Sequence, residues 1–140
     1  MQHYSGQCHC GNIQFECIGE PLFTQHCHCQ KCRDVASLSS NDADNIGHSF
    51  TAAYLTTKFN ITHGEDQLES IVKNTSELLL CNQCKSLIYG ISLDTNKQGG
   101  IGINATNFKF TNGQPDSFNP VRHIFYVDRV IDVNDSLPKF

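Results

Sequence analysis

Cysteine is the residue whose spacing in this chain most clearly points to chemistry. Eight cysteines occur among 140 residues, and seven of them fall into three close sets. The sets are C-x-C (Cys8 and Cys10), C-x-C-x-x-C (Cys27, Cys29 and Cys32) and C-x-x-C (Cys81 and Cys84). In a reducing compartment such cysteines are more often metal ligands or catalytic groups than disulfides. The pattern therefore predicts metal binding, with four disulfides in an exported protein as the alternative.

The first and last sets together supply enough ligands for a closed zinc site. In an extended chain residues i and i+2 point to the same side, so Cys8 and Cys10 can direct two sulfurs at one ion while His9 points away. Cys81 and Cys84 can do the same from a tight turn. Because four thiolates complete a tetrahedral shell, we expect a structural zinc site that joins two distant parts of the chain.

The middle set differs because it offers three cysteines. Cys27 and Cys29 share one side of an extended segment and Cys32 returns after a turn, so the three sulfurs can meet at one metal ion. Three protein ligands leave the fourth position to water or a substrate atom, as in catalytic zinc sites. A shell of thiolates favours an incoming thiol over making hydroxide. The alternative is a second structural site completed by a histidine, namely His26, His28 or His123.

Three histidines and one arginine could lie near the middle set, and the sequence predicts a different role for the arginine than for the histidines. His28 lies between two ligand positions and is expected to point away from their metal, and His26 has the same strand parity. His123 precedes an alternating strand and is expected to be packed and hydrogen-bonded, not a base. Arg33 follows a ligand directly and is a candidate to bind a substrate carboxylate, with a surface or supporting cation as the alternative.

Length and charge exclude several other classes of protein. A chain of 140 residues fits a single domain, predicted to span residues 1–140. The net charge is −4, with 10 basic and 14 acidic residues and no run of either sign, so no nucleic-acid partner is expected. The start has no secretory signal, and no segment approaches the roughly 20 apolar residues that cross a bilayer. We therefore expect a cytoplasmic protein without a membrane partner.

Short alternating segments predict the strands that must hold these cysteines. In GNIQFECIG, Ile13, Phe15 and Cys17 alternate with polar residues, which predicts a half-buried strand and assigns Cys17 to the core. Further strands are predicted within 49–66, 68–74, 99–108 and 122–133, and on both sides of the C-x-x-C turn, at Leu78–Leu80 and Leu87–Ser92. The best helical candidate is residues 31–40. The fold class is therefore mainly β, with short antiparallel strands and little helix.

These motifs resemble the family of glutathione-dependent formaldehyde-activating enzymes and centromere protein V. The resemblance extends from Gly6 to Phe140 and is carried by GQCHCGNIQF, CHCQKCR, LCNQC, PVRHIFYVDR and DSLPKF. It implies a single-domain fold called a β-tent that holds two zinc ions per chain. It also implies which cysteines hold which ion: Cys8, Cys10, Cys81 and Cys84 the structural zinc, and Cys27, Cys29 and Cys32 the catalytic zinc.

The resemblance further implies a carbon-sulfur lyase that adds the thiol of glutathione to formaldehyde, giving S-hydroxymethylglutathione. We expect zinc on the middle set to bind the substrate thiol, lower its pKa and present it to the aldehyde. Two alternatives stay open. One is a zinc-stabilised binding module without catalysis, since the centromere protein V branch shows that the fold has more than one role. The other is the same chemistry on a different thiol or carbonyl compound.

Two positions depart from the family's pattern. The residue directly after C-x-x-C is usually glycine, and here it is Lys85, which must adopt a left-handed conformation at some cost or change the turn. A glycine usually found a few residues after the catalytic Cys-Arg is replaced by Ala36. The first departure leaves the zinc ligands intact, whereas the second lies on the substrate side and bears on the choice of glutathione.

Overall fold

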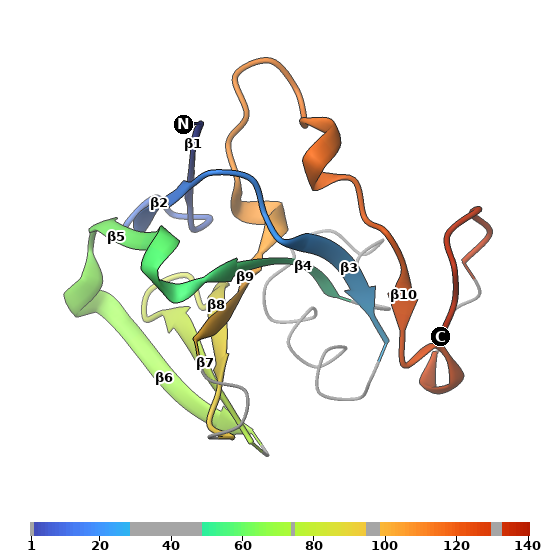
Figure 1. Ribbon diagram of the computed structural model, residues 1–140. Coiled ribbons are helices and arrows are strands. Elements are labelled where there is room, and N and C mark those ends of the chain that lie inside the picture. Colours follow the sequence, from blue (N-terminus) through green and yellow to red (C-terminus); the bar gives the residue numbers. More distant parts are fainter. Residues whose placement is uncertain (1, 29–48, 74, 95–98, 130–132) are drawn as a thin grey trace.

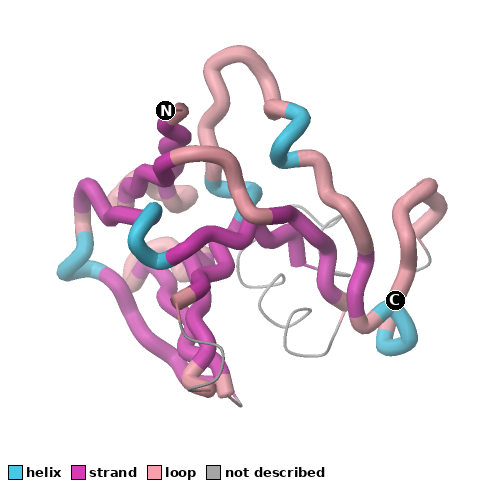
Figure 2. The backbone as a smooth tube through the Cα atoms, in the orientation of Figure 1, coloured by secondary structure: helices cyan, strands magenta, loops and turns pink. Residues whose placement is uncertain are grey.

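Strands dominate the computed structural model, which describes residues 2–28, 49–73, 75–94, 99–129 and 133–140. Figure 2 shows the strands joined by loops and single helical turns. The strands are β1 (His3–Gln7), β2 (Gln14–Ile18), β3 (Phe23–Cys27), β4 (Ser49–Leu55), β5 (Phe59–His63), β6 (Leu68–Lys73), β7 (Ser76–Cys81), β8 (Leu87–Ser92), β9 (Gly100–Asn104) and β10 (His123–Ile124). The 3-10 turns are η2 (Thr56–Lys58), η3 (Glu65–Gln67), η5 (Ala105–Asn107), η6 (Asp116–Phe118) and η7 (Tyr126–Asp128). The predicted mainly β class is confirmed.

The strands form two separate sheets (Figure 1). The smaller sheet has the order β1-β2-β5, and the larger has the order β10-β3-β4-β9-β8-β7-β6. The ladders between these strands are antiparallel except that between β10 and β3, which is parallel. This order places β10, from the end of the chain, directly beside β3, which ends at Cys27.

The core lies between the sheets and confirms the alternation predicted for β2. Ile13, Phe15 and Cys17 are at most 1% exposed, whereas Gln14 between them is exposed. The ring of Phe15 meets that of Phe108 edge to face, with centroids 5.2 Å apart. Burial of each large apolar side chain contributes about 1.5–3 kcal/mol, so this packing holds the small sheet against the large one.

The C-terminal segment departs from the prediction. Among the described residues of 122–133 the strand covers His123–Ile124, because Phe125 adopts a left-handed backbone conformation (φ 51°) and the chain turns into η7. The last residues then return to β10, where the N–H of Phe140 donates to the carbonyl of His123 at 2.9 Å. The helix predicted for 31–40 lies outside the described residues. None of the described helices is long and apolar enough to cross a bilayer.

Candidate metal centre

Four cysteines from the two sheets meet at one point. Cys8 and Cys10 follow β1 of the small sheet, whereas Cys81 ends β7 and Cys84 lies in the turn before β8 of the large sheet. Their sulfur atoms all lie within 4.8 Å of one another. We call these residues the four-cysteine cluster. Cys8 and Cys81 are buried, Cys84 is partly exposed and Cys10 is exposed, so the cluster lies at the surface edge of the core.

A tight turn directs the first two sulfurs, so the extended geometry predicted for Cys8 and Cys10 is wrong. The N–H of Gly11 donates to the carbonyl of Cys8, and the N–H of Cys8 donates to the carbonyl of Ile13, both at 3.0 Å. The two sulfurs nevertheless converge to 3.5 Å. The N–H of Ile13 donates to the sulfur of Cys8 at 3.3 Å.

The second pair of sulfurs depends on a left-handed residue. The N–H of Lys85 donates to the carbonyl of Cys81 at 2.9 Å, which closes the C-x-x-C turn, and Lys85 has a φ of 62°. Lys85 thus takes the left-handed conformation that glycine adopts without steric cost. Of the two alternatives that the sequence left open, a left-handed Lys85 or a changed turn, the first is present. Its ammonium group lies 2.5 Å from the carboxylate of Glu69 at the surface.

We expect Lys85→Gly to raise the free energy of unfolding by up to about 1 kcal/mol. Relief of the left-handed strain gains about 1–2 kcal/mol, and the greater freedom of glycine in the unfolded chain cancels part of that gain. Urea denaturation of the zinc-loaded protein measures the difference. Lys85→Met is the matched control, because it loses the ion pair with Glu69 but keeps the strain. A lower stability of Lys85→Gly than of Lys85→Met would contradict the argument.

The spacing of the sulfurs fits Zn²⁺. A tetrahedral shell with Zn–S bonds of about 2.3 Å separates its sulfurs by about 3.8 Å. The sulfur of Cys10 lies 3.5 Å from that of Cys8 and 3.6 Å from that of Cys81. A closed set of four thiols with this spacing suits a structural metal ion and leaves no position for a substrate.

The pKa values of two thiols in the four-cysteine cluster also favour a bound cation. The backbone N–H of Asn12 favours the thiolate of Cys10, but burial and the neighbouring thiols outweigh it and raise the pKa of Cys10 to about 12. Burial opposes the ionisation of Cys84, yet hydrogen bonds from Ser86 lower the pKa of Cys84 to about 6. One thiol of the cluster is therefore prepared to ionise, whereas another needs a nearby positive charge.

Ser86 is a residue of the centre that the sequence analysis missed. Its side chain is fully buried, and its hydroxyl oxygen accepts the N–H of His9 at 3.4 Å and lies 3.1 Å from the sulfur of Cys84. The side-chain amide of Asn12 also donates to Gln83, which joins the same two turns. The sequence could have identified Ser86 by its position two residues after Cys84, because a side chain at that spacing can reach the thiolate of Cys84.

Gly64 supports the first cysteine turn from behind. It has a φ of 82°, and a Cβ atom there would lie 2.0 Å from the carbonyl oxygen of Asn12. We expect Gly64→Ala to lower the free energy of unfolding by about 3 kcal/mol, since overpacking adds to the left-handed strain. Gly113→Ala is the matched control, because Gly113 has a φ of 83° but no heavy atom within 4 Å of the added Cβ. Urea denaturation of both variants tests this, and equal losses would contradict the clash.

Of the middle set, Cys27, Cys29 and Cys32, only Cys27 belongs to the residues that the structure describes. Cys27 ends β3, is 6% exposed, and lies between Ser49 of β4 and Ile124 of β10 in the sheet. Cys29, Cys32, Arg33 and Ala36 lie outside the described residues. The site of three thiolates with an open position therefore stays a prediction, and the described fold places its first member at the edge shared by β3 and β10.

Histidines gather beside Cys27. His28 and His123 are fully buried, and the Nε2 atom of His28 lies 2.9 Å from the Nδ1 atom of His123. The ring of His26 stacks on that of His123, with centroids 4.9 Å apart. His123 is thus packed and hydrogen-bonded, as the sequence indicated. Its second partner, Asp135 at 2.8 Å, was missed because no local motif connects an acidic residue of the C-terminal segment with this strand.

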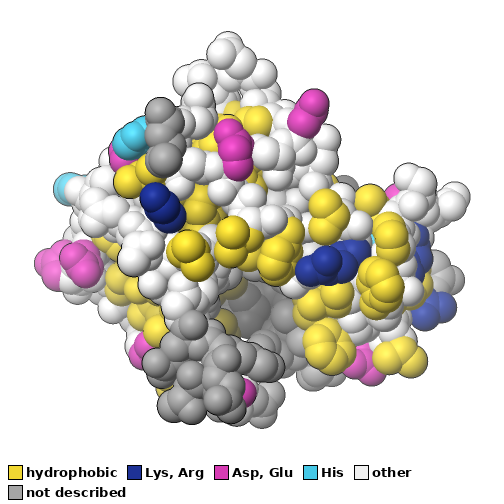
Figure 3. Space-filling view, viewed as in Figure 1, with side chains coloured by type: hydrophobic (Ala, Val, Ile, Leu, Met, Phe, Trp, Pro, Cys, Tyr) yellow, Lys and Arg dark blue, Asp and Glu magenta, His cyan; other side chains and the backbone are white. Residues whose placement is uncertain are grey.

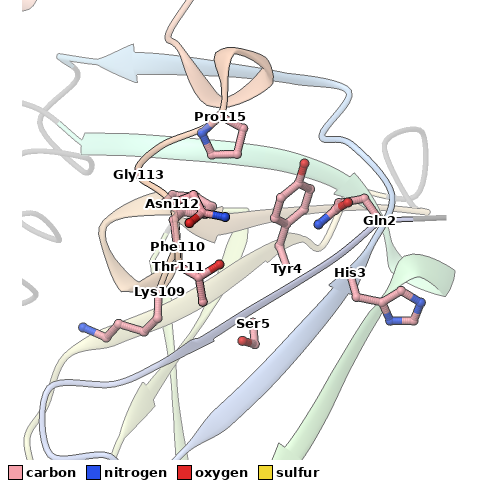
Figure 4. A pocket seen from close by; sticks show the side chains of 10 residues that line it. All are labelled: Gln2, His3, Tyr4, Ser5, Lys109, Phe110, Thr111, Asn112, Gly113 and Pro115. Atoms are coloured by element: carbon pink, nitrogen blue, oxygen red, sulfur yellow. The ribbon is translucent and has the colours of Figure 1, made fainter.

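A separate cavity of about 350 Å³ lies between β1 and the loop 109–115. Figure 4 shows its lining, to which Tyr4, Ser5, Lys109 and Thr111 contribute. None of the cysteines that the structure describes lines it, and the hydroxyl of Tyr4 donates to the carboxylate of Glu20 at 2.7 Å. The cavity is therefore separate from the four-cysteine cluster.

Comparisons with known proteins indicate the family and the fold of the chain. The model of a family described as glutathione-dependent formaldehyde-activating enzyme matches residues 3–128. Among solved structures, the chain is similar to a crystal structure of a Rhodobacter sphaeroides protein, with a TM-score of 0.60 and 18% identity over 85% of this chain and 98% of that one. At that identity the likeness shows a shared fold. No curated protein matches the chain.

Proposed function

The chain belongs to the family of glutathione-dependent formaldehyde-activating enzymes, and from this membership we propose that it catalyses the addition of glutathione to formaldehyde. The observation that carries the proposal is the family match over residues 3–128, which includes all seven clustered cysteines. The product is S-hydroxymethylglutathione, so the enzyme is a carbon-sulfur lyase acting in the direction of synthesis. We expect it in the cytoplasm, where a reducing environment keeps thiols free.

In this proposal one group of cysteines has a structural role and the other a catalytic role. The four-cysteine cluster would hold a structural Zn²⁺, since its four ligands already form a closed shell. The three-cysteine set, Cys27, Cys29 and Cys32, would hold a second Zn²⁺, whose positive charge lowers the pKa of a thiol bound beside it. In this proposal the backbone of Cys27 has a fixed position, because β3 is hydrogen-bonded to β4 on one side and to β10 on the other.

The reaction forms one bond to carbon and needs no outside oxidant or reductant. The sulfur of glutathione attacks the carbonyl carbon of formaldehyde and forms the C–S bond. The carbonyl π electrons move to oxygen, which ends as a hydroxyl group after taking a proton. The thiol supplies that proton, so atoms and electrons balance. The same step read backwards releases formaldehyde, which is the lyase direction.

Basic side chains beside β10 support a substrate with carboxylates. Figure 3 shows hydrophobic and basic side chains together over β10 and the C-terminal segment. The guanidinium of Arg129 lies 4.4 Å from the ring centroid of Tyr126, and Arg122 donates to Gln25 at 2.9 Å. Glutathione carries two carboxylates, and a guanidinium binds a carboxylate through two parallel hydrogen bonds. We propose Arg33 for this role, with Arg122 and Arg129, beside β10, as further candidates.

Exchange spectroscopy tests the proposed activity directly. Glutathione and carbon-13 formaldehyde form the adduct slowly without a catalyst, and NMR follows the exchange between free and adduct forms. We expect the zinc-loaded protein to raise the exchange rate well above the background. An exchange rate equal to the background, with two zinc ions per chain, would overturn the proposal. Replacing glutathione with cysteine or another small thiol in the same assay measures how far the enzyme selects its thiol.

A further inference from the structure

A continuous chain of hydrogen bonds runs from the C-terminal segment to the end of β3. The carboxylate of Asp135 contacts the Nε2 atom of His123 at 2.8 Å, and the Nδ1 atom of His123 contacts the Nε2 atom of His28 at 2.9 Å. On its other oxygen, Asp135 binds the ammonium group of Lys139 at 2.7 Å. Both imidazoles are fully buried, whereas the side chain of Asp135 is 34% exposed.

The carboxylate sets the order of donors and acceptors along this chain. Hydrogen bonds from Lys139 and then His123 lower the pKa of Asp135, so the carboxylate is ionised and can only accept. His123 must therefore carry its proton on Nε2, which leaves a lone pair on its Nδ1. That lone pair in turn accepts from the Nε2–H of His28. With both rings neutral, each has the Nε2–H tautomer.

The surroundings hold both rings in place. The backbone N–H of His28 donates to the carbonyl of Ile124 at 3.0 Å, so His28 extends the pairing of β3 with β10 by one residue. The ring of Tyr126 meets that of His28 edge to face, with centroids 5.0 Å apart. Because His28 directly follows Cys27, a shift of its backbone away from Ile124 would also move that cysteine.

We propose that Asp135 and His123 are positioning residues that hold His28 in one tautomer and orientation and thereby fix the end of β3 that carries Cys27. The importance of this placement for catalysis rests on the proposed function. The hydrogen-bonded order itself rests on described residues alone. Removing a carboxylate that orients a metal-ligating imidazole commonly changes metal affinity or activity by about 10–100-fold, and we expect the lower end of that range for an imidazole that directly follows a proposed ligand.

The variant Asp135→Asn tests the order of the chain. The ammonium group of Lys139 and the backbone N–H of Leu137 both donate to the Oδ1 atom of Asp135, so they will hold the oxygen of the new amide there and leave the NH₂ group facing His123. The NH₂ group donates, so His123 must accept on Nε2 and carry its proton on Nδ1, which reverses His28 as well. Nitrogen-15 NMR of the ring nitrogens, at about pH 8 where ordinary imidazoles are neutral, reports both tautomers. We expect both rings to change from the Nε2–H to the Nδ1–H form.

Two further variants separate positioning from a general loss of stability. Lys139→Met removes the ammonium group but keeps the carboxylate of Asp135, whose Oδ1 atom still accepts the N–H of Leu137 at 3.1 Å, so we expect the original tautomers and most of the activity to remain. Glu16→Gln is the matched control, since it breaks an exposed carboxylate–histidine pair of 2.7 Å to His3 far along the sequence. It should change neither the rings of His28 and His123 nor the rate.

The proposal predicts that Asp135→Asn lowers kcat/KM by about tenfold or more while leaving the zinc of the four-cysteine cluster in place. Unchanged tautomers in Asp135→Asn would overturn it, and so would reversed tautomers with an unchanged rate. An equal loss of rate in Glu16→Gln would also overturn it. If the wild-type protein shows the stated tautomers but does not accelerate adduct formation, the proposed function fails while the hydrogen-bonded order stands.

Discussion

Cys81→Ala is expected to abolish the folded state of the protein under conditions where the wild type is stable. Cys81 is fully buried and its sulfur lies 3.6 Å from that of Cys10, 71 residues away in the chain. Structural zinc contributes roughly 10–16 kcal/mol in small zinc-dependent domains, whereas the net stability of a domain is about 5–15 kcal/mol. Losing one of four thiolates removes most of that binding energy and releases the contact between the two sheets.

Cys17→Ala is the control for this prediction. Cys17 is equally buried but packs in the core of the small sheet and does not belong to the four-cysteine cluster. Its truncation should cost about 1 kcal/mol and leave the zinc content unchanged. Zinc per chain after gel filtration and thermal melting with and without a chelator compare the two variants. Retention of all zinc by Cys81→Ala, with a melting temperature equal to that of Cys17→Ala, would refute the role of the cluster.

Cys27→Ser is expected to lower the rate of adduct formation by at least about a hundredfold without unfolding the protein. Changes behind metal ligands already cost about 10–100-fold, so the loss of a proposed ligand should cost no less. Serine keeps the size of the side chain within β3, and the four-cysteine cluster lies elsewhere, at the ends of β1 and β7. Urea denaturation should therefore show a nearly unchanged midpoint.

The measurement for Cys27→Ser combines the exchange rate with a zinc count. We expect zinc per chain to fall from two toward one, because the structural ion stays bound. Cys17→Ala again serves as the control, since it also removes a buried thiol but should keep both ions and the full rate. A variant that retains its rate would show that Cys27 does not serve the reaction, whatever the fate of the four-cysteine cluster.

Much of the fold follows from local patterns. The alternation of Ile13, Phe15 and Cys17 predicted β2 and its buried face, because a strand places every second side chain on the same side. The C-x-x-C turn between two apolar strands is likewise present between β7 and β8. The strand predicted within 122–133 is present as β10 but is short, because alternation says nothing about the backbone of Phe125, whose left-handed conformation ends β10.

The spacing of the cysteines determined which residues are candidate ligands and how they divide into sets, since a short spacing limits where neighbouring side chains can point. The count of four thiolates also predicted that the first and last sets share one site. Only the tertiary structure decided that Ser86 lies between the turn after β1 and the turn before β8. It alone joined His28, His123 and Asp135, which come from three separate segments. The physical reason is that such contacts depend on how whole strands pair and pack, and no local periodicity records that pairing.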